Sequence, residues 1–80
     1  MILYSEYDVN AVQKIAQQEI KNGADKRVWL SNILDAALMG TLEYLQKAKI
    51  IDKVILNEDT FFDTIHTKAE IKEFCKEFTK

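Results

Sequence analysis

The longest dense apolar stretch of the chain, residues 28–45, constrains the fold more than any other feature of the sequence. Its aliphatic side chains recur at spacings of three and four residues, the period of one helix face, and the pattern continues to residue 48. The stripe consists of Leu30, Ile33, Leu34, Ala37, Leu38, Leu45 and Ala48. A single strand of this length would exceed the usual range. We therefore expect residues 30–48 to form one long central helix.

Gly40 is the ambiguous position in this stretch. A glycine inside a helix costs about 1 kcal/mol relative to alanine. Gly40 and Thr41 are also the residue types that end one helix and cap the next. Because the apolar stripe keeps its phase across Gly40, the pattern favours a continuous or kinked helix over a break.

The composition favours helices in the rest of the chain as well. The 80 residues include no proline and only two glycines, which leaves few residues suited to tight turns. An apolar fraction of 48% with 30% charged residues fits a folded globular chain rather than a disordered one. We expect residues 1–80 to form a single all-α domain, a small bundle of about four helices around the long central helix.

An α+β fold is the alternative. The short apolar segment 1–4 has the character of an edge strand, and residues 53–56 have the composition of a second strand. Against this, apolar residues recur at four-residue spacing through 50–55, which favours a helix there.

Local capping signals predict where several helices begin and end. Asp8 is suited to cap a helix over 9–22, and Asn22-Gly23 is suited to end it with glycine in the left-handed conformation. Asp25 is the expected N-cap of the central helix.

Two further helix starts follow in the last third of the chain. Asn57 resembles the N-cap of a short amphipathic helix that ends near His66. Thr67 and Glu70 have the spacing of a capping box, which predicts a separate terminal helix.

Four polar residues are candidates for metal ligands. Asp59, Asp63, His66 and Glu70 follow one another at steps of four, three and four, so on one uninterrupted helix they would share a face. The capping box at Thr67 predicts that the helix breaks between His66 and Glu70. We therefore predict no metal site.

The sequence carries no recognisable catalytic or cofactor motif. Cys75 and His66 together suggest a nucleophile and a base, but Cys75 lies on the apolar side of the terminal helix, where thiols are normally inert. Glycine-rich phosphate loops, nucleophile elbows and zinc-binding spacings are lacking. The expectation is a protein without enzymatic activity and without a cofactor.

The sequence also suggests a location in the cell. Asp35 and Glu43 interrupt the central apolar stretch, so it does not resemble a membrane span. The N-terminal segment does not resemble a secretory signal, and a single cysteine is simplest in a reducing compartment. We expect a cytoplasmic protein.

Nucleic-acid binding is the alternative function. Two helices joined near Gly40-Thr41 would mimic a helix-turn-helix, with lysines after the turn to contact phosphates. The formal net charge of −2 and the presence of one arginine, Arg27, argue against nucleic acid as a partner.

Protein–protein interaction is the function that the sequence favours. Apolar side chains on a second face of the central helix predict a surface covered by another protein, including a second copy of this chain as a homodimer. The predicted partner-binding residues are Trp29, Asp35, Met39 and Leu42. A small inhibitor, an antitoxin-like protein or an adaptor of bacterial or mobile-element origin would fit this expectation.

An acidic group offers a second contribution to such binding. Glu58, Asp59 and Asp63 flank the pair Phe61-Phe62. Negative charge around this aromatic pair would steer a basic partner toward this part of the chain.

Overall fold

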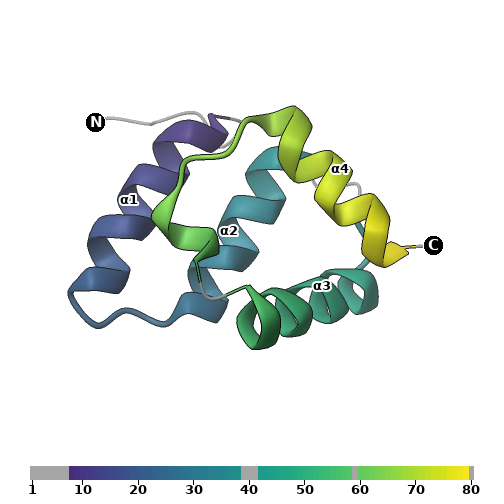
Figure 1. Cartoon of the computed structure of the whole chain (residues 1–80), viewed down its shortest axis with the longest axis horizontal. Coiled ribbons are helices and arrows are strands. Elements are labelled where there is room, and N and C mark those ends of the chain that lie inside the picture. Colours follow the sequence, from purple (N-terminus) through teal and green to yellow (C-terminus); the bar gives the residue numbers. More distant parts are fainter. Residues whose placement is uncertain (1–7, 39–41, 59, 80) are drawn as a thin grey trace.

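The computed structural model describes residues 8–38, 42–58 and 60–79 of the chain (Figure 1). They form the helices α1 (Val9–Lys21), α2 (Lys26–Leu38), α3 (Tyr44–Asn57) and α4 (Lys68–Thr79) and a 3-10 turn, η1 (Phe61–Asp63). No strand occurs in these ranges, and the predicted all-α bundle is confirmed. The alternative strand at 53–56 is wrong, because these residues lie within α3, and the alternative strand at 1–4 lies outside the described residues.

The predicted start of α1 is confirmed. The Asp8 carboxylate accepts a hydrogen bond from the Ala11 N–H at 3.1 Å, which satisfies one of the free donors at the helix start. The helix ends at Lys21, and Gly23 adopts a φ of 102°, a conformation that side chains with a Cβ rarely adopt. Asn22-Gly23 thus turns the chain toward α2, as the sequence predicts.

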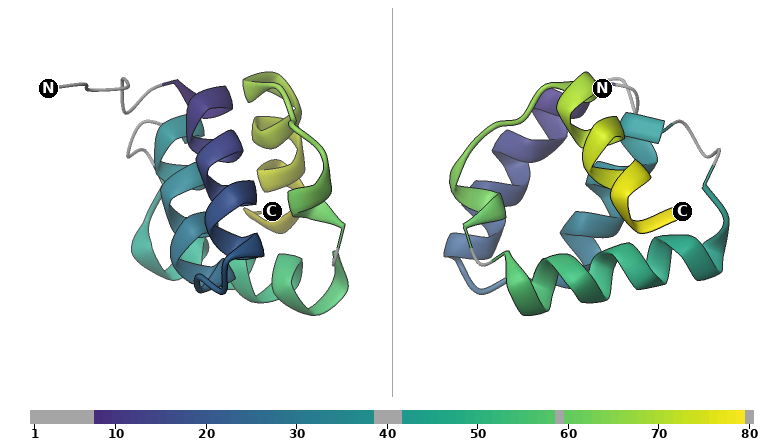
Figure 2. Two further views of the ribbon diagram at one scale, coloured as in Figure 1. Left: turned by 90° about the vertical axis from the view of Figure 1, so that its left-hand side faces the viewer. Right: turned by 45° about the vertical axis from the view of Figure 1, so that its right-hand side comes forward.

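Helix α2 is the central element of the bundle. Asp25 precedes it as predicted, and its carboxylate accepts a hydrogen bond from the Arg27 N–H at 2.8 Å. The helix packs against α1, α3 and α4 (Figures 1 and 2). Contact with three helices explains why Ala36, which lies outside the predicted stripe, is buried together with Leu30 and Ile33.

The predicted long central helix over residues 30–48 is wrong. Helix α2 ends at Leu38, Glu43 has an extended backbone (φ −70°, ψ 152°), and α3 begins at Tyr44. The extended residue changes the direction of the chain, so the helical phase of α2 does not continue into α3. Leu45, which the phase predicts to be in the core, is 73% exposed.

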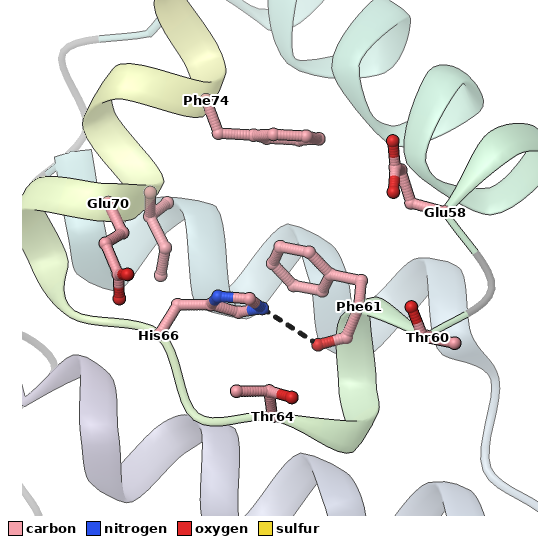
Figure 3. A pocket seen from close by; sticks show the side chains of 8 residues that line it. Glu58, Thr60, Phe61, Thr64, His66, Glu70 and Phe74 are labelled. Carbon is pink, nitrogen blue, oxygen red and sulfur yellow. Dashed lines mark hydrogen bonds between the residues drawn. The ribbon is translucent and has the colours of Figure 1, made fainter.

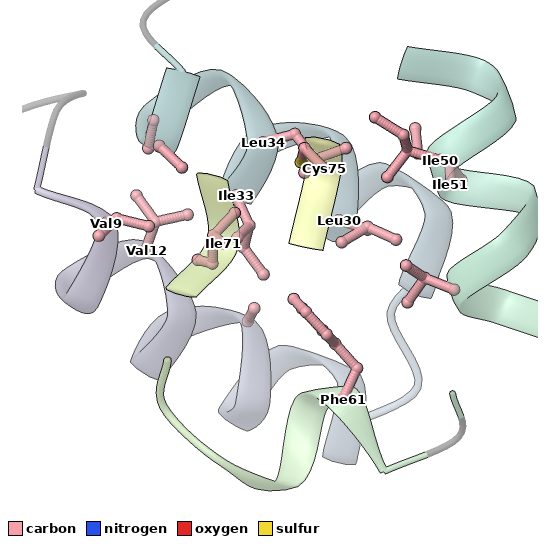
Figure 4. Packing of buried hydrophobic residues seen from close by; sticks show 14 of the residues in the cluster. Val9, Val12, Leu30, Ile33, Leu34, Ile50, Ile51, Phe61, Ile71 and Cys75 are labelled. Atoms are coloured by element: carbon pink, nitrogen blue, oxygen red, sulfur yellow. The ribbon is translucent and has the colours of Figure 1, made fainter. Parts of the chain in front are cut away.

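The apolar core draws side chains from all five elements (Figure 4). Its largest fully buried members are Leu30, Ile33, Leu34, Ile50, Ile71 and Val54. Smaller residues such as Ala16 and Ala37, both at 0% exposure, let the helices approach closely. Because these side chains exclude one another's surfaces from water, their burial is the main stabilising contribution to the fold.

The segment between α3 and α4 differs from its prediction. Asn57 is the last residue of α3 rather than an N-cap, and its side-chain amide donates back to the Lys53 carbonyl at 3.1 Å. Only the short turn η1 forms where a helix to His66 was predicted. The capping box of α4 is confirmed by bonds from the Thr67 N–H to Glu70 Oε1 at 2.7 Å and from the Glu70 N–H to Thr67 Oγ1 at 3.1 Å.

Two glutamines of α1 hold this segment in place. The Gln13 side chain is buried and exchanges two hydrogen bonds with the His66 backbone, at 2.7 Å to the carbonyl and 2.8 Å from the N–H. The Gln17 amide donates to the Phe62 carbonyl at 2.8 Å. These bonds satisfy the His66 N–H, the His66 carbonyl and the Phe62 carbonyl, three backbone groups that have no regular helical partner here.

Candidate partner-binding surface

The four residues predicted to bind a partner do not form one surface in the described structure. Trp29 and Leu42 are partly buried and pack against the core. Asp35 is exposed and forms an ion pair with Lys47 of α3 at 2.8 Å. Trp29 and Asp35 are six residues apart on α2, so they point about 120° away from each other around the helix axis. Met39 lies outside the described residues, and a binding role for the four stays a prediction.

A different exposed surface lies on α3. Leu45 and Leu56 are 73% and 79% exposed, although both are large apolar side chains. Lys49 and Asp52 are exposed between them. At about 100° per residue, all four side chains fall within an arc of about 60° around the helix. We call Leu45, Lys49, Asp52 and Leu56 the outer stripe of α3.

The opposite side of α3 explains why the outer stripe faces solvent. Ile50 and Val54 are at 0% exposure and pack into the core, and Ile51 is 7% exposed. This inner side is already satisfied by contacts with α2 and α4. The leucines of the outer stripe therefore do not contribute to the core. A single exposed leucine would be ordinary, but two on one helix face form a defined surface.

The charges of the outer stripe are arranged in a specific order. The Arg27 guanidinium of α2 lies 2.7 Å from the Asp52 carboxylate, with both side chains about half exposed (51% and 57%). Such an exposed pair contributes little to stability but fixes the orientation of the carboxylate. Lys49 lies one turn before Asp52, so the stripe runs from leucine through a cation and an anion to leucine.

The sequence reasoning missed the outer stripe because it placed Leu45 in the core. That placement depended on a helix that keeps its phase through Gly40. The spacing from Leu45 to Leu56 indicates a shared exposed face only once it is known that the helix begins at Tyr44 and that Ile50 and Val54 form its buried face.

A hollow of about 330 Å³ lies between the end of α3, η1 and the start of α4 (Figure 3). It is lined by Glu58, Thr60, Phe61, Thr64, His66, Glu70, Ile71 and Phe74. The His66 ring stacks on Phe61 with centroids 4.7 Å apart, and its Nε2 lies 3.1 Å from the Phe61 carbonyl oxygen. The hollow thus combines aromatic rings with two carboxylates.

The thiol of Cys75, the candidate nucleophile, lies in an unreactive environment. Cys75 is buried, and burial raises the pKa of its thiol to about 11, so the thiol stays protonated and unreactive at neutral pH.

The predicted break between His66 and Glu70 is confirmed, since Glu70 belongs to α4 and Asp63 to η1. Asp59 lies outside the described residues, and within the described ranges no group of three or more His, Cys, Asp or Glu residues is placed to hold a metal ion.

Lys47 and Lys49 follow the turn between α2 and α3, where a helix-turn-helix would contact phosphates, and both have acidic side chains nearby. Lys47 pairs with Asp35, and Asp52 lies on the same face of α3 as Lys49. Negative charge thus accompanies the positive charge along α3.

In the part of the chain that the structure describes, no helix has the length and apolar character needed to cross a membrane. Comparison of the chain with family models, with curated proteins and with solved structures finds no match.

Proposed function

We propose that this chain is a non-enzymatic protein–protein interaction module that pairs with a second copy of itself through the outer stripe of α3. The observation that carries this proposal is the pair of strongly exposed leucines, Leu45 and Leu56, with opposite charges between them on one helix face. Burying such leucines against another apolar surface is favourable, since each exposes a large aliphatic side chain to water.

The residue spacing of the outer stripe is the same in both directions along α3, with the positive and negative positions exchanged. The spacings from Leu45 to Lys49, Asp52 and Leu56 are four, three and four residues. Two α3 helices related by a two-fold axis and running antiparallel would place Leu45 of each copy opposite Leu56 of the other. Lys49 of each copy would face Asp52 of the other. A surface that is complementary to itself is what a two-fold dimer requires.

The charges select this antiparallel arrangement over the parallel one. In a parallel pair, Lys49 would face Lys49 and Asp52 would face Asp52, and like charges in contact are unfavourable. In the antiparallel pair, each Asp52 carboxylate lies between Arg27 of its own chain and Lys49 of the second copy. A carboxylate has enough lone pairs to accept both.

The expected dimer is weak and depends on concentration. One pair of helices buries less than the roughly 1,200–2,000 Å² of a standard stable interface. Tyr44 is 79% exposed at the start of α3 and would add aromatic contact area at the edge of the stripe. Such an interface suits a module that exchanges partners.

Among the roles for such a module, we favour a small inhibitor, an antitoxin-like protein or an adaptor of bacterial or mobile-element origin. Each of these acts by covering another protein rather than by chemistry.

The helix-turn-helix alternative would use the same α2–α3 pair but would bind DNA. Retention on a DNA column that falls steeply with salt would favour that alternative over ours.

Sedimentation equilibrium over a series of concentrations tests the proposal. We expect the mass to rise from one chain toward two, and we expect Leu45→Glu to weaken the association at least about tenfold, because it removes both leucine pairs of a two-fold interface. Ala69→Glu, an apolar-to-acidic change at an exposed position of α4, is the matched control and should leave the association unchanged. A mass of one chain at every concentration would contradict the proposal.

A further inference from the structure

The hollow between α3, η1 and α4 has an aromatic floor. The Phe61 ring lies between His66, stacked at 4.7 Å, and Phe74, whose ring centroid is 5.8 Å away with the planes tilted by 40°. Figure 3 shows the three rings near one another, between Glu70 and Glu58. The faces of aromatic rings carry negative electrostatic potential, so they attract cations.

Two carboxylates border the same hollow. Figure 3 shows Glu70 and Glu58 on opposite sides of the rings, Glu70 from α4 and Glu58 at the end of α3. The capping box holds the Glu70 carboxylate in place, and hydrogen bonds from the Thr67 N–H and then from its hydroxyl lower the pKa of Glu70. Glu70 is therefore ionised at neutral pH, and no lysine or arginine is among the described residues that line the hollow.

The polar side chain on the floor adds an acceptor. In the tautomer in which His66 Nε2 donates to the Phe61 carbonyl, Nδ1 keeps a lone pair. The backbone of His66 is fixed by Gln13, so the ring is held against Phe61 rather than free to turn away. Ring faces, an imidazole acceptor and two carboxylates all favour one kind of ligand group, a planar cation with several N–H donors.

We infer that this hollow binds an arginine side chain of a partner protein. The guanidinium is planar, stacks on aromatic rings and donates up to five hydrogen bonds, so it suits a hollow lined by aromatic rings and carboxylates. A lysine ammonium is a compact, strongly hydrated charge that does not stack on a ring. None of the residues of the outer stripe lines the hollow.

An NMR titration with N-acetylarginine amide tests this inference. We expect saturable shifts of the backbone amides of residues 61, 66, 70 and 74, and no comparable shifts with N-acetylcitrulline amide, which has nearly the same shape without the charge. Equal shifts with the citrulline probe would overturn the inference. Equal binding of N-acetyllysine amide would overturn the choice of arginine.

Variants that keep the fold provide the decisive comparison. Glu70→Gln removes the charge but keeps a residue type that completes a capping box, and Glu58→Gln removes the second charge. Each should weaken the arginine probe about two- to fivefold, as for the loss of one solvent-accessible ion pair. Glu73→Gln changes an exposed residue of α4 that pairs with Lys76 outside the hollow, and it should leave the affinity unchanged. The inference fails if the three variants behave alike.

The same titration on the Leu45→Glu chain separates this site from the proposed dimer. Unchanged probe binding is expected there, because every residue that lines the hollow comes from one chain and none of them is changed. A probe affinity that disappears with the dimer would show that the hollow depends on pairing and would overturn the inference as stated.

Discussion

Gln13 connects two parts of the chain that are more than fifty residues apart. Its side chain is 3% exposed, and its amide group both donates to and accepts from the backbone of His66. A buried amide with matched partners stabilises one arrangement of the neighbouring segment, because any other arrangement leaves polar groups without partners.

Replacing Gln13 by leucine should therefore destabilise the chain. We expect a loss of about 1–3 kcal/mol in the free energy of unfolding, the usual cost of leaving buried backbone groups of the partner unpaired. Urea denaturation followed by circular dichroism measures it. Gln18→Leu, an exposed position on the same helix, is the control and should change the stability by less than about 0.5 kcal/mol. Equal midpoints for the two variants would contradict the role given to Gln13.

Cys75 should react with thiol reagents only when the chain opens. Burial raises the pKa of its thiol from the ordinary 9.0 to about 11, so almost no thiolate exists in the folded chain at pH 8. The rate of modification at pH 8 should be far lower in buffer than in denaturing urea. The contribution of this thiol to stability is full below pH 9 and is lost as the pH rises through 11, because the unfolded chain then ionises first. Fast modification of the folded chain would contradict this environment.

The starts of α1, α2 and α4 could be predicted from the sequence, because a cap is a local interaction. Asp8, Asp25 and the pair Thr67–Glu70 act within three residues of themselves, so the sequence is sufficient to identify them. Asn57 was the exception. Its amide bonds to the carbonyl four residues before it, inside α3, and nothing local distinguishes that bond from a cap at the start of a helix.

At the scale of the helices, the prediction failed where one helix ends and the next begins. The apolar stripe of α2 and the apolar residues of α3 happen to be in phase across Gly40, although Glu43 is extended. Hydrophobic spacing alone does not distinguish a continuous helix from two helices with a turn between them. The outer stripe of α3 could not be predicted for the same reason.

The start of α4 should be sensitive to acid. The hydrogen bonds from Thr67 lower the pKa of Glu70 below its ordinary 4.5, so the ionised form stabilises the fold at higher pH. This contribution is present above pH 4.5 and is lost as the pH falls through the lower, folded-state value. The stability difference between the unaltered chain and Glu70→Gln should therefore shrink below pH 4.5, as measured by urea midpoints at several pH values. A difference that is constant with pH would contradict the capping role of the charge.

At the scale of the whole molecule, α2 organises the bundle by contacting the other three helices. The apolar residues that make this possible could be predicted from the sequence, since Leu30, Ile33 and Leu34 follow the helical period. The hollow could not be predicted, because Glu58, His66 and Glu70 come together only after η1 is tied to α1 and α4 folds back over α3 (Figure 2). Long-range packing of this kind leaves no periodic signal in the sequence.

Self-complementary pairing of α3 predicts how two single-charge variants, Lys49→Glu and Asp52→Lys, associate alone and when mixed. Lys49→Glu places acidic side chains against each other in an antiparallel pair, and Asp52→Lys does the same with basic side chains, so each variant alone should stay monomeric. When the two are mixed, the introduced glutamate faces the introduced lysine. The unaltered Asp52 of one chain then faces the unaltered Lys49 of the other, so opposite charges meet at both contacts. The loss of the Arg27–Asp52 pair in Asp52→Lys should cost little stability, because both side chains are about half exposed.

The mass of this mixture by sedimentation equilibrium is the most direct test of pairing through α3. We predict that each variant sediments as a single chain at a concentration where the unaltered protein pairs, and that the equimolar mixture sediments as two chains. Lys14→Glu, an exposed change of the same charge on α1, should pair as the unaltered chain does. A mixture that remains monomeric while the unaltered chain and the control pair would contradict antiparallel association through α3.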